Sequence, residues 1–166
     1  MKTVYLVRHA KSSWDIGGIE DRDRPLKGRG IRDAHLISEY LYKQRAVDHV
    51  HLVSSPATRA LHTALIFAKN FGIPAGEINI EDVLYLCSAE ELGAFIQGLD
   101  NAVDVVYIFS HNPGILQFVN KYTAHKLDHV PTTGVVSIRY DVAQWEDAQQ
   151  GELLQFEYPK RLKANQ

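Results

Sequence analysis

The chain has 166 residues, the length of one ordinary domain, and a formal net charge of -2 at pH 7. Its 18 basic and 20 acidic residues give no polycationic surface, so we expect no nucleic-acid partner. Apolar runs are far shorter than the roughly 20 residues of a membrane helix, and the single cysteine, Cys87, cannot form an internal disulfide. With no recognisable secretory leader, the sequence predicts a soluble cytoplasmic protein that does not bind membranes.

An apolar, β-branched run over residues 4–7 stops abruptly at Arg8 and His9. This pattern is typical of a strand buried on both faces of a parallel sheet, and the polar residues after such a strand emerge at its carboxyl edge. Open α/β sheets bind ligands at that edge. A guanidinium beside an imidazole favours a bound anion, of which phosphate is the commonest. Alone, the dipeptide is a weak signal.

A second strand-to-helix junction follows. Residues 49–53 indicate a buried strand, and the next helix, ending near Phe71, is expected to be capped by the serines and proline of 54–56. Arg59 would then lie in the first helical turn, close to free backbone N–H groups and the positive end of the helix dipole. Such a helix start is a good anion site, although a surface arginine is the plainer alternative.

A third apolar strand, 103–109, ends just before His111. Because the carboxyl ends of parallel strands share one edge, Arg8, His9, Arg59 and His111 can converge there, although the junctions lie about 50 residues apart. Two guanidiniums and two imidazoles suit a tetrahedral dianion, and one imidazole remains to attack phosphorus. We therefore expect phosphoryl transfer that needs no metal or other cofactor.

The rest of the chain alternates between helical and strand patterns without an internal repeat. It indicates one domain over 1–160, a three-layer α/β/α sandwich with a mostly parallel sheet and an antiparallel edge strand, and a frayed tail over 161–166. The other expected elements are a polar loop over 15–29 (or a solvated linker), a helix from Gly28 or Gly30 to about Gln44, an edge strand and loop within 78–86, a helix from a Ser88–Glu91 capping box to about Asp100, a helical face over 115–119, and a strand pair at 135–140 and 153–158.

Four segments resemble, in the right order, motifs of the histidine phosphatase superfamily (the phosphoglycerate-mutase-like proteins), and most closely its SixA-like phosphohistidine phosphatases. The resemblance covers nearly the whole domain and implies the phosphoglycerate-mutase-like fold. The segments are Leu6 to Trp14, similar to the superfamily's Arg-His-Gly box, Asp23 to Leu26 with Gly30, Ser54 to Thr63 around Arg59, and Ser110 to Pro113 around His111.

The resemblance also implies roles for individual residues. His9 would be the nucleophile that accepts the phosphoryl group, Arg8 and Arg59 would clamp the phosphate, and His111 would be a further donor to the phosphoryl oxygens. Ser12 and Asn112 lie beside these residues and are candidate substrate contacts.

The sequence does not identify a general acid. The mutases and many acid phosphatases of this superfamily carry a carboxylic acid in a segment that does not match cleanly here, which leaves Glu81, Asp82 and Glu90 as open candidates. An imidazole leaving group needs less acid help than an alkoxide, so a protein phosphohistidine is the favoured substrate. The alternatives are a phosphomonoesterase or phosphomutase acting on a small phosphorylated metabolite, and a non-catalytic module that binds a phosphorylated partner. The oligomeric state stays open.

Overall fold

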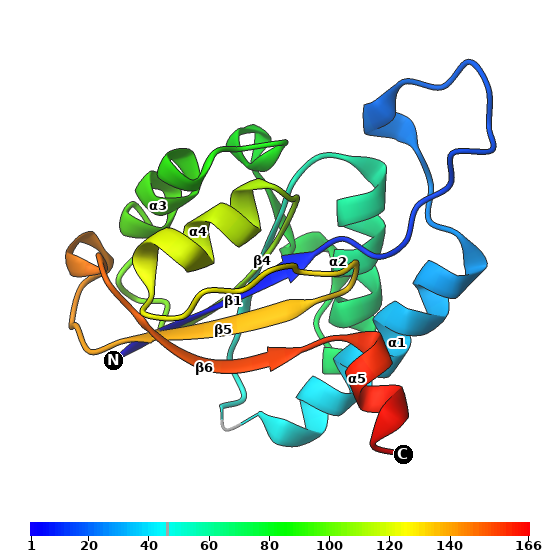
Figure 1. Ribbon diagram of the computed structural model, residues 1–166. Coiled ribbons are helices and arrows are strands. Elements are labelled where there is room, and N and C mark those ends of the chain that lie inside the picture. The colour runs from blue at the N-terminus through cyan, green and yellow to red at the C-terminus, as the bar shows by residue number, and fades with distance from the viewer. Residues whose placement is uncertain (46) are drawn as a thin grey trace.

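The structure, a computed structural model, describes residues 1–45 and 47–166. Within these residues one six-stranded sheet has the order β3-β2-β4-β1-β5-β6 (Figure 1). The first four strands in the chain run parallel, and β5 pairs antiparallel with both β1 and β6. The strands are β1 (Lys2–Arg8), β2 (His51–Ser54), β3 (Asn79–Ile80), β4 (Val105–Ser110), β5 (Val135–Tyr140) and β6 (Glu152–Glu157).

Helices cover both faces of the sheet, as Figure 1 shows, and the expected mostly parallel α/β architecture is confirmed. On one face lie α1 (Gly28–Gln44) and α2 (Thr58–Phe71), and on the other lie α3 (Ala89–Gln97) and α4 (Gly114–Tyr122). Short 3-10 turns include η1 (Asp21–Asp23) and η3 (Asp82–Leu84). None of the helices described is long and apolar enough to cross a membrane.

The continuous apolar run of β4 follows from its burial on both faces. Val106 and Ile108 pack on the side of α3 and α4, whereas Tyr107 and Phe109 pack on the side of α1 and α2. Because side chains alternate along a strand, a central strand covered on both faces has no polar side. Polar chemistry is therefore confined to the ends of such strands.

The prediction of a frayed tail over 161–166 is wrong. Residues Pro159–Ala164 form a helix, α5, with proline at its start. Leu162 is buried in the core that α1 and α2 share, and Lys163 Nζ donates to Asp33 Oδ1 at 2.8 Å. One apolar residue within a charged segment was too weak a signal for this packing.

Two details of helix boundaries also differ from expectation. The serines and proline of 54–56 do not cap α2, because Ser54 belongs to β2 and the N-cap is Ala57, which makes no side-chain hydrogen bond. The helix opened by Ser88 ends at Gln97, not near Asp100, while its capping box is present as predicted. The Ser55 hydroxyl instead lies 2.8 Å from His111 Nε2.

Candidate active site

The three expected junctions meet at the carboxyl edge of the sheet. Arg8 is the last residue of β1, Arg59 lies in the first turn of α2, and His111 directly follows β4. β1 and β4 are neighbours with Arg8 opposite Ser110, so the rings of His9 and His111 come within 5.3 Å between centroids. Together with Ser12 and Asn112, these residues line one cleft of about 200 Å³. Its other lining residues are Lys11, Trp14, Arg24, Leu86 and Thr132.

His9 is held in one tautomer, in which Nε2 is unprotonated. Its Nδ1 lies 2.8 Å from the carbonyl oxygen of Ala10. Because a carbonyl can only accept, Nδ1 carries the proton and Nε2 keeps its lone pair. Arg59 Nε donates to that nitrogen at 3.3 Å. Burial, aided by neighbouring arginine charges and opposed by the Ala10 hydrogen bond, lowers the pKa of His9 to about 4, so the ring is neutral at pH 7.

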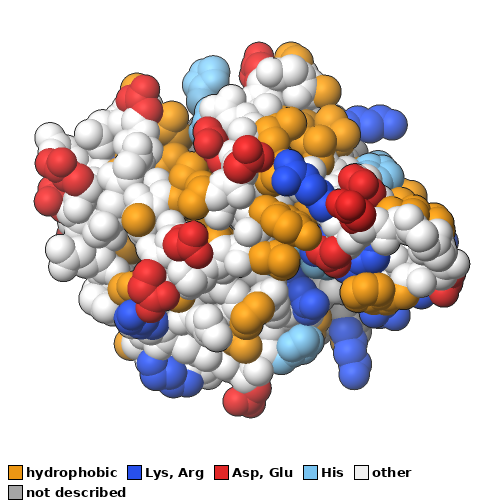
Figure 2. Space-filling model, turned by 90° about the horizontal axis from the view of Figure 1, so that it is seen from above, with side chains coloured by type: hydrophobic (Ala, Val, Ile, Leu, Met, Phe, Trp, Pro, Cys, Tyr) orange, Lys and Arg blue, Asp and Glu red, His pale blue; other side chains and the backbone are white. Residues whose placement is uncertain are grey.

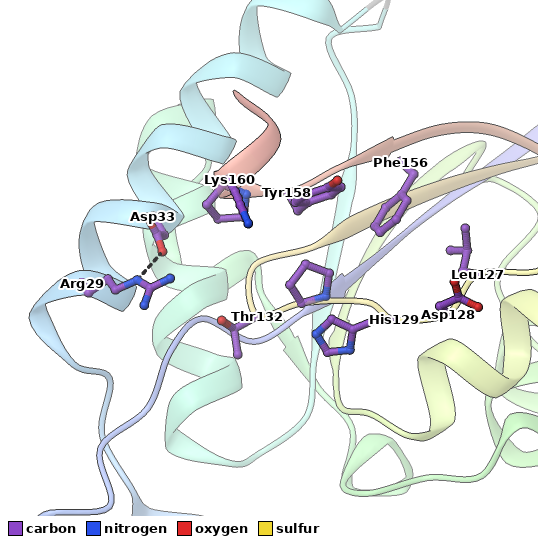
Figure 3. A pocket seen from close by; sticks show the side chains of 11 residues that line it. Arg29, Asp33, Leu127, Asp128, His129, Thr132, Phe156, Tyr158 and Lys160 are labelled. Carbon is purple, nitrogen blue, oxygen red and sulfur yellow. Dashed lines mark ion pairs between the residues drawn. The ribbon is translucent and has the colours of Figure 1, made fainter. Parts of the chain in front are cut away.

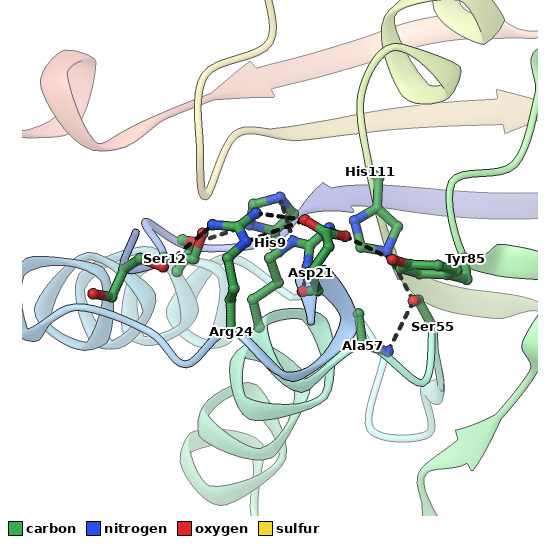
Figure 4. Close-up of polar contacts among 11 residues, drawn as sticks. His9, Ser12, Asp21, Arg24, Ser55, Ala57, Tyr85 and His111 are labelled. Atoms are coloured by element: carbon green, nitrogen blue, oxygen red, sulfur yellow. Dashed lines mark hydrogen bonds and ion pairs between the residues drawn. The ribbon is translucent and has the colours of Figure 1, made fainter. Parts of the chain in front are cut away.

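Asp21, in the loop between β1 and α1, forms hydrogen bonds with Arg59 and Arg24 of the cleft, and Figure 4 shows it between Arg24 and Tyr85. Arg59, which is 2% exposed, donates from Nη1 to the Asp21 carbonyl at 2.7 Å and from Nη2 to Oδ2 at 3.0 Å. Arg24 Nε donates to Oδ1 at 3.1 Å, and the Tyr85 hydroxyl donates to Oδ2 at 2.6 Å. The Tyr85 hydrogen bond first, and then Arg59 and Arg24, lower the pKa of Asp21 to about 2.

Two buried donors of the cleft have no hydrogen-bond partner within the described part of the chain. Arg8 anchors Nη1 on the Val130 carbonyl at 2.9 Å but leaves Nε unpaired. His111 places Nε2 at 2.8 Å from Ser55 Oγ and leaves Nδ1 unpaired. Burial, reinforced by the charges of His9 and Arg59, lowers the pKa of His111 to about 3. An anion in the cleft would accept from Arg8 Nε, and from His111 Nδ1 when that nitrogen carries the ring proton.

Ser12 and Asn112 lie in the cleft, but each is already engaged. Ser12 Oγ accepts from Arg24 Nη1 at 2.7 Å. Asn112 Nδ2 donates to the Val130 carbonyl at 2.9 Å, the same carbonyl that holds Arg8. Ser12 therefore helps to hold Arg24, Asn112 shares an acceptor with Arg8, and both side chains line the cleft.

Sequence reasoning missed Arg24, Asp21, Ser55 and Tyr85. Arg24 lies within the Asp23 to Leu26 motif that resembles the superfamily's Asp-x-Pro-Leu loop, yet no strand ends there, and a solvated linker explains its segment equally well. The linker alternative is wrong, because this loop folds over the sheet edge and Arg24 is buried against Ser12. The first turn of α1 approaches the Lys11 backbone closely at Gly30, where an added Cβ would lie 2.3 Å from the Lys11 carbonyl oxygen.

None of the three carboxylates considered as general acids, Glu81, Asp82 and Glu90, lines the cleft. Asp82 pairs with Arg22 at 3.5 Å, and Glu90 pairs with Lys121 at 2.6 Å. Over residues 1–45 and 47–166, no group of three His, Cys, Asp or Glu side chains could hold a metal ion.

A larger hollow lies beside the cleft and shares Thr132 with it. This side groove, of about 510 Å³, is bordered by α1, α5, the end of β6 and the loop before β5 (Figure 3). Its buried carboxylate, Asp33, is paired with Arg29 and Lys163. The other lining residues are Leu127, Asp128, His129, Pro131, Phe156, Tyr158, Pro159 and Lys160.

Comparison with known proteins matches the N-terminal half to a family. The model of the histidine phosphatase superfamily (branch 1) matches residues 4–84. The probable phosphoglycerate mutase GpmB of Yersinia pestis (strain Pestoides F) is 37% identical over 75 residues, which are 44% of this chain and 34% of that relative. The match thus spans about a third of the relative's length.

Solved structures extend the likeness over the whole fold. The protein histidine phosphatase SixA complexed with tungstate aligns with a TM-score of 0.82 and 23% identity, covering 96% of this chain and 99% of that one. The putative phosphohistidine phosphatase SixA from Agrobacterium tumefaciens aligns with a TM-score of 0.78 and 25% identity, covering 95% and 98%. Residues 4–84 are thus similar to the histidine phosphatase superfamily (branch 1), and the whole chain shares the fold of the SixA structures.

Proposed function

We propose that this chain is a metal-independent phosphatase that forms a phosphohistidine on His9 and acts on a protein phosphohistidine. The observation that carries the proposal is the state of His9: Nδ1 is fixed on the Ala10 carbonyl, and the unprotonated Nε2 lies in a cleft with three arginines. An uncharged imidazole nitrogen beside phosphate-binding guanidiniums is the arrangement that nucleophilic attack on phosphorus requires.

In the first step the arginines bind the phosphoryl oxygens. Arg59 Nε turns from His9 Nε2 to a phosphoryl oxygen, which frees the lone pair. His9 Nε2 then forms a bond to phosphorus as the bond from phosphorus to the leaving group breaks, and the leaving group takes that electron pair. A phosphohistidine ring departs as neutral imidazole, because its other ring nitrogen takes a proton from solvent before the bond breaks. Arg8 and Arg24 bind the remaining oxygens and stabilise the charge that spreads over them.

His111 is suited to donate from Nδ1. Ser55 Oγ accepts from the Ala57 N–H at 3.2 Å, so its own hydrogen can point to His111 Nε2. That tautomer places the ring proton on Nδ1, the unpaired nitrogen, which points toward His9 in Figure 4. His111 would thus donate a hydrogen bond to a phosphoryl oxygen while remaining neutral.

In the second step water attacks the phosphorus of the intermediate. The bond between phosphorus and Nε2 breaks, its electron pair returns to His9, and inorganic phosphate leaves with the oxygen of that water. The proton lost by the water passes to the product phosphate or to solvent. No metal ion is required in either step.

Among the described residues no carboxylic acid lines the cleft, and this favours a nitrogen leaving group. Asp21 is the carboxylate that contacts the cleft arginines, and its low pKa leaves it ionised at pH 7. An alkoxide would need a proton that no carboxylic acid lining this cleft supplies, whereas an imidazole departs with less help. This supports phosphohistidine over a phosphate ester.

The second candidate is a phosphomonoesterase or phosphomutase acting on a small metabolite. The likeness to a probable phosphoglycerate mutase over 75 residues favours it. In that case the leaving alkoxide would have to take its proton from water or from the substrate itself, because Glu81, Asp82 and Glu90 lie outside the cleft lining.

Phosphate release in chelator, from a phosphohistidine protein and from aryl and sugar phosphates, tests the proposal. We expect wild type and the matched control His125→Ala, an exposed histidine, to hydrolyse the phosphohistidine protein, and His9→Ala to be inactive. Faster turnover of sugar phosphates would favour the second candidate. Phosphate binding without any hydrolysis would favour a binding module instead.

A further inference from the structure

Exposed hydrophobic side chains gather on the two segments that border the cleft. Trp14 is 71% exposed and Ile16 50%, both in the loop after β1, while Val83 is 42% and Leu86 53% exposed in the segment around η3. Trp14 and Leu86 themselves line the cleft. Figure 2 looks down on the side where the loop lies, and hydrophobic side chains cluster near its middle beside charged ones. We name these four residues the apolar rim.

Leu86 is held in an unusual conformation at this rim. Its φ of 50° lies in the left-handed region, which costs a leucine more than it costs glycine or asparagine. A residue that is both strained and exposed gains nothing from core packing. This combination indicates that an apolar side chain at the mouth of the cleft serves a contact outside the chain.

The cleft is too small to hold a polypeptide. Its volume of about 200 Å³ accommodates a phosphoryl group and the side chain that bears it, but lies below the range of about 300–1,000 Å³ typical of small-molecule pockets. The residues that flank a phosphorylated side chain must therefore rest on the surface around the cleft. On two sides that surface is the apolar rim.

We propose that the apolar rim docks hydrophobic residues flanking the phosphorylated side chain of a protein substrate. The inference rests on the proposed function, and it identifies the partner by chemistry: an anionic group enters the cationic cleft while apolar neighbours cover Leu86, Val83, Trp14 and Ile16. Apolar contact around a central charged anchor is a common design of protein interfaces.

Two phosphohistidine peptides test the rim, one flanked by Leu and Phe and the other by Ser and Gly, with free phosphohistidine as the reference. We expect wild type to prefer the apolar peptide by about tenfold in kcat/KM, mainly through KM. Leu86→Asn, which suits a left-handed backbone, and Val83→Asn should each erase most of that preference. Leu154→Asn, at a residue 46% exposed on β6, is the matched control and should keep it.

The outcomes separate the two proposals. Hydrolysis of free phosphohistidine with no preference between the peptides, or a preference that survives Leu86→Asn, would overturn the rim and leave the phosphatase standing. If nothing is hydrolysed, the proposed function fails. Calorimetric affinities for the same peptides then test the rim separately: tighter binding of the apolar peptide supports the rim, and equal binding overturns it. A wild-type dimer that Leu86→Asn makes monomeric, without peptide preference, would assign the rim to a second copy of this chain.

Discussion

The cleft and the side groove adjoin at Thr132, but they differ in volume, in the side chains of their walls and in the burial of their charged groups. The side groove is the larger, about 510 Å³ against about 200 Å³, and aromatic side chains form part of its wall. Its arginine, Arg29, is 67% exposed at the side chain, and its one buried carboxylate is neutralised by two cations. In the cleft, by contrast, Arg59 and His111 are almost fully buried, and Arg8 Nε and His111 Nδ1 have no hydrogen-bond partner among the described residues.

The difference shows what locates the chemistry. The volume of a hollow depends only on how the loops around it pack. Buried ionisable groups with shifted pKa values, in contrast, cluster at functional sites. His9 and His111 have lowered pKa values because they are buried among cations. The smaller hollow is therefore the candidate active site.

Of the substitutions that compare the cleft with the side groove, Arg59→Ala should cause the largest loss of activity. The variant loses a clamp on the phosphoryl group and the partner of His9 Nε2, so kcat/KM should fall by about 10²–10³-fold. Arg29→Ala is the matched control in the side groove and should stay within about twofold of wild type. Steady-state kinetics on phosphohistidine measures both, and equal losses would contradict the assignment.

Asp21→Asn should lower kcat/KM by about tenfold. The change weakens the hydrogen bonds that hold Arg59 and Arg24 in place while leaving His9 untouched. Tyr85→Phe, which removes one donor to the same carboxylate, should show a smaller loss in the same parameter. If Asp21 acted as a general acid, its replacement would instead remove a basic limb from the pH profile of ester hydrolysis.

The two cleft histidines should make stability depend on pH between about 6.5 and 4. Their pKa values are lowered in the folded state, so the unfolded chain binds more protons in this window and acid favours unfolding. The free energy of unfolding should fall by up to about 1.4 kcal/mol per pH unit for each histidine. Urea melts at several pH values measure this dependence. The unfolding free energy of His9→Gln should change less with pH than that of wild type, and an equal change would refute the burial of a neutral ring.

Tyr158→Ala, in the side groove, should have the smallest effect. Its ring packs against Phe156 and contacts none of the cleft residues by hydrogen bond. Turnover of free phosphohistidine should remain within about twofold of wild type. A large loss confined to protein substrates would mean that the side groove, and not the apolar rim alone, contacts the partner.

The sequence predicted the strands and the convergence of Arg8, His9, Arg59 and His111, because buried parallel strands that end in polar residues are a strong local signal. It could not predict what the loops contribute. Arg24 and Asp21 reach the cleft only because the loop folds back over the sheet edge, and this depends on tertiary contacts such as the one at Gly30. The helix at Pro159–Ala164 was missed for the same reason, since one buried leucine and one ion pair hold it.

The most direct test of the central claim is to trap the intermediate. Wild type mixed with a phosphohistidine substrate, quenched in alkali and digested, should yield a peptide whose phosphoryl group is acid-labile and located on His9 by mass spectrometry. Arg59→Ala should trap less, and His9→Ala should trap none while still binding inorganic phosphate. Full turnover with no phosphoryl group on His9 at any time, or with the group on another residue, would contradict nucleophilic catalysis by His9.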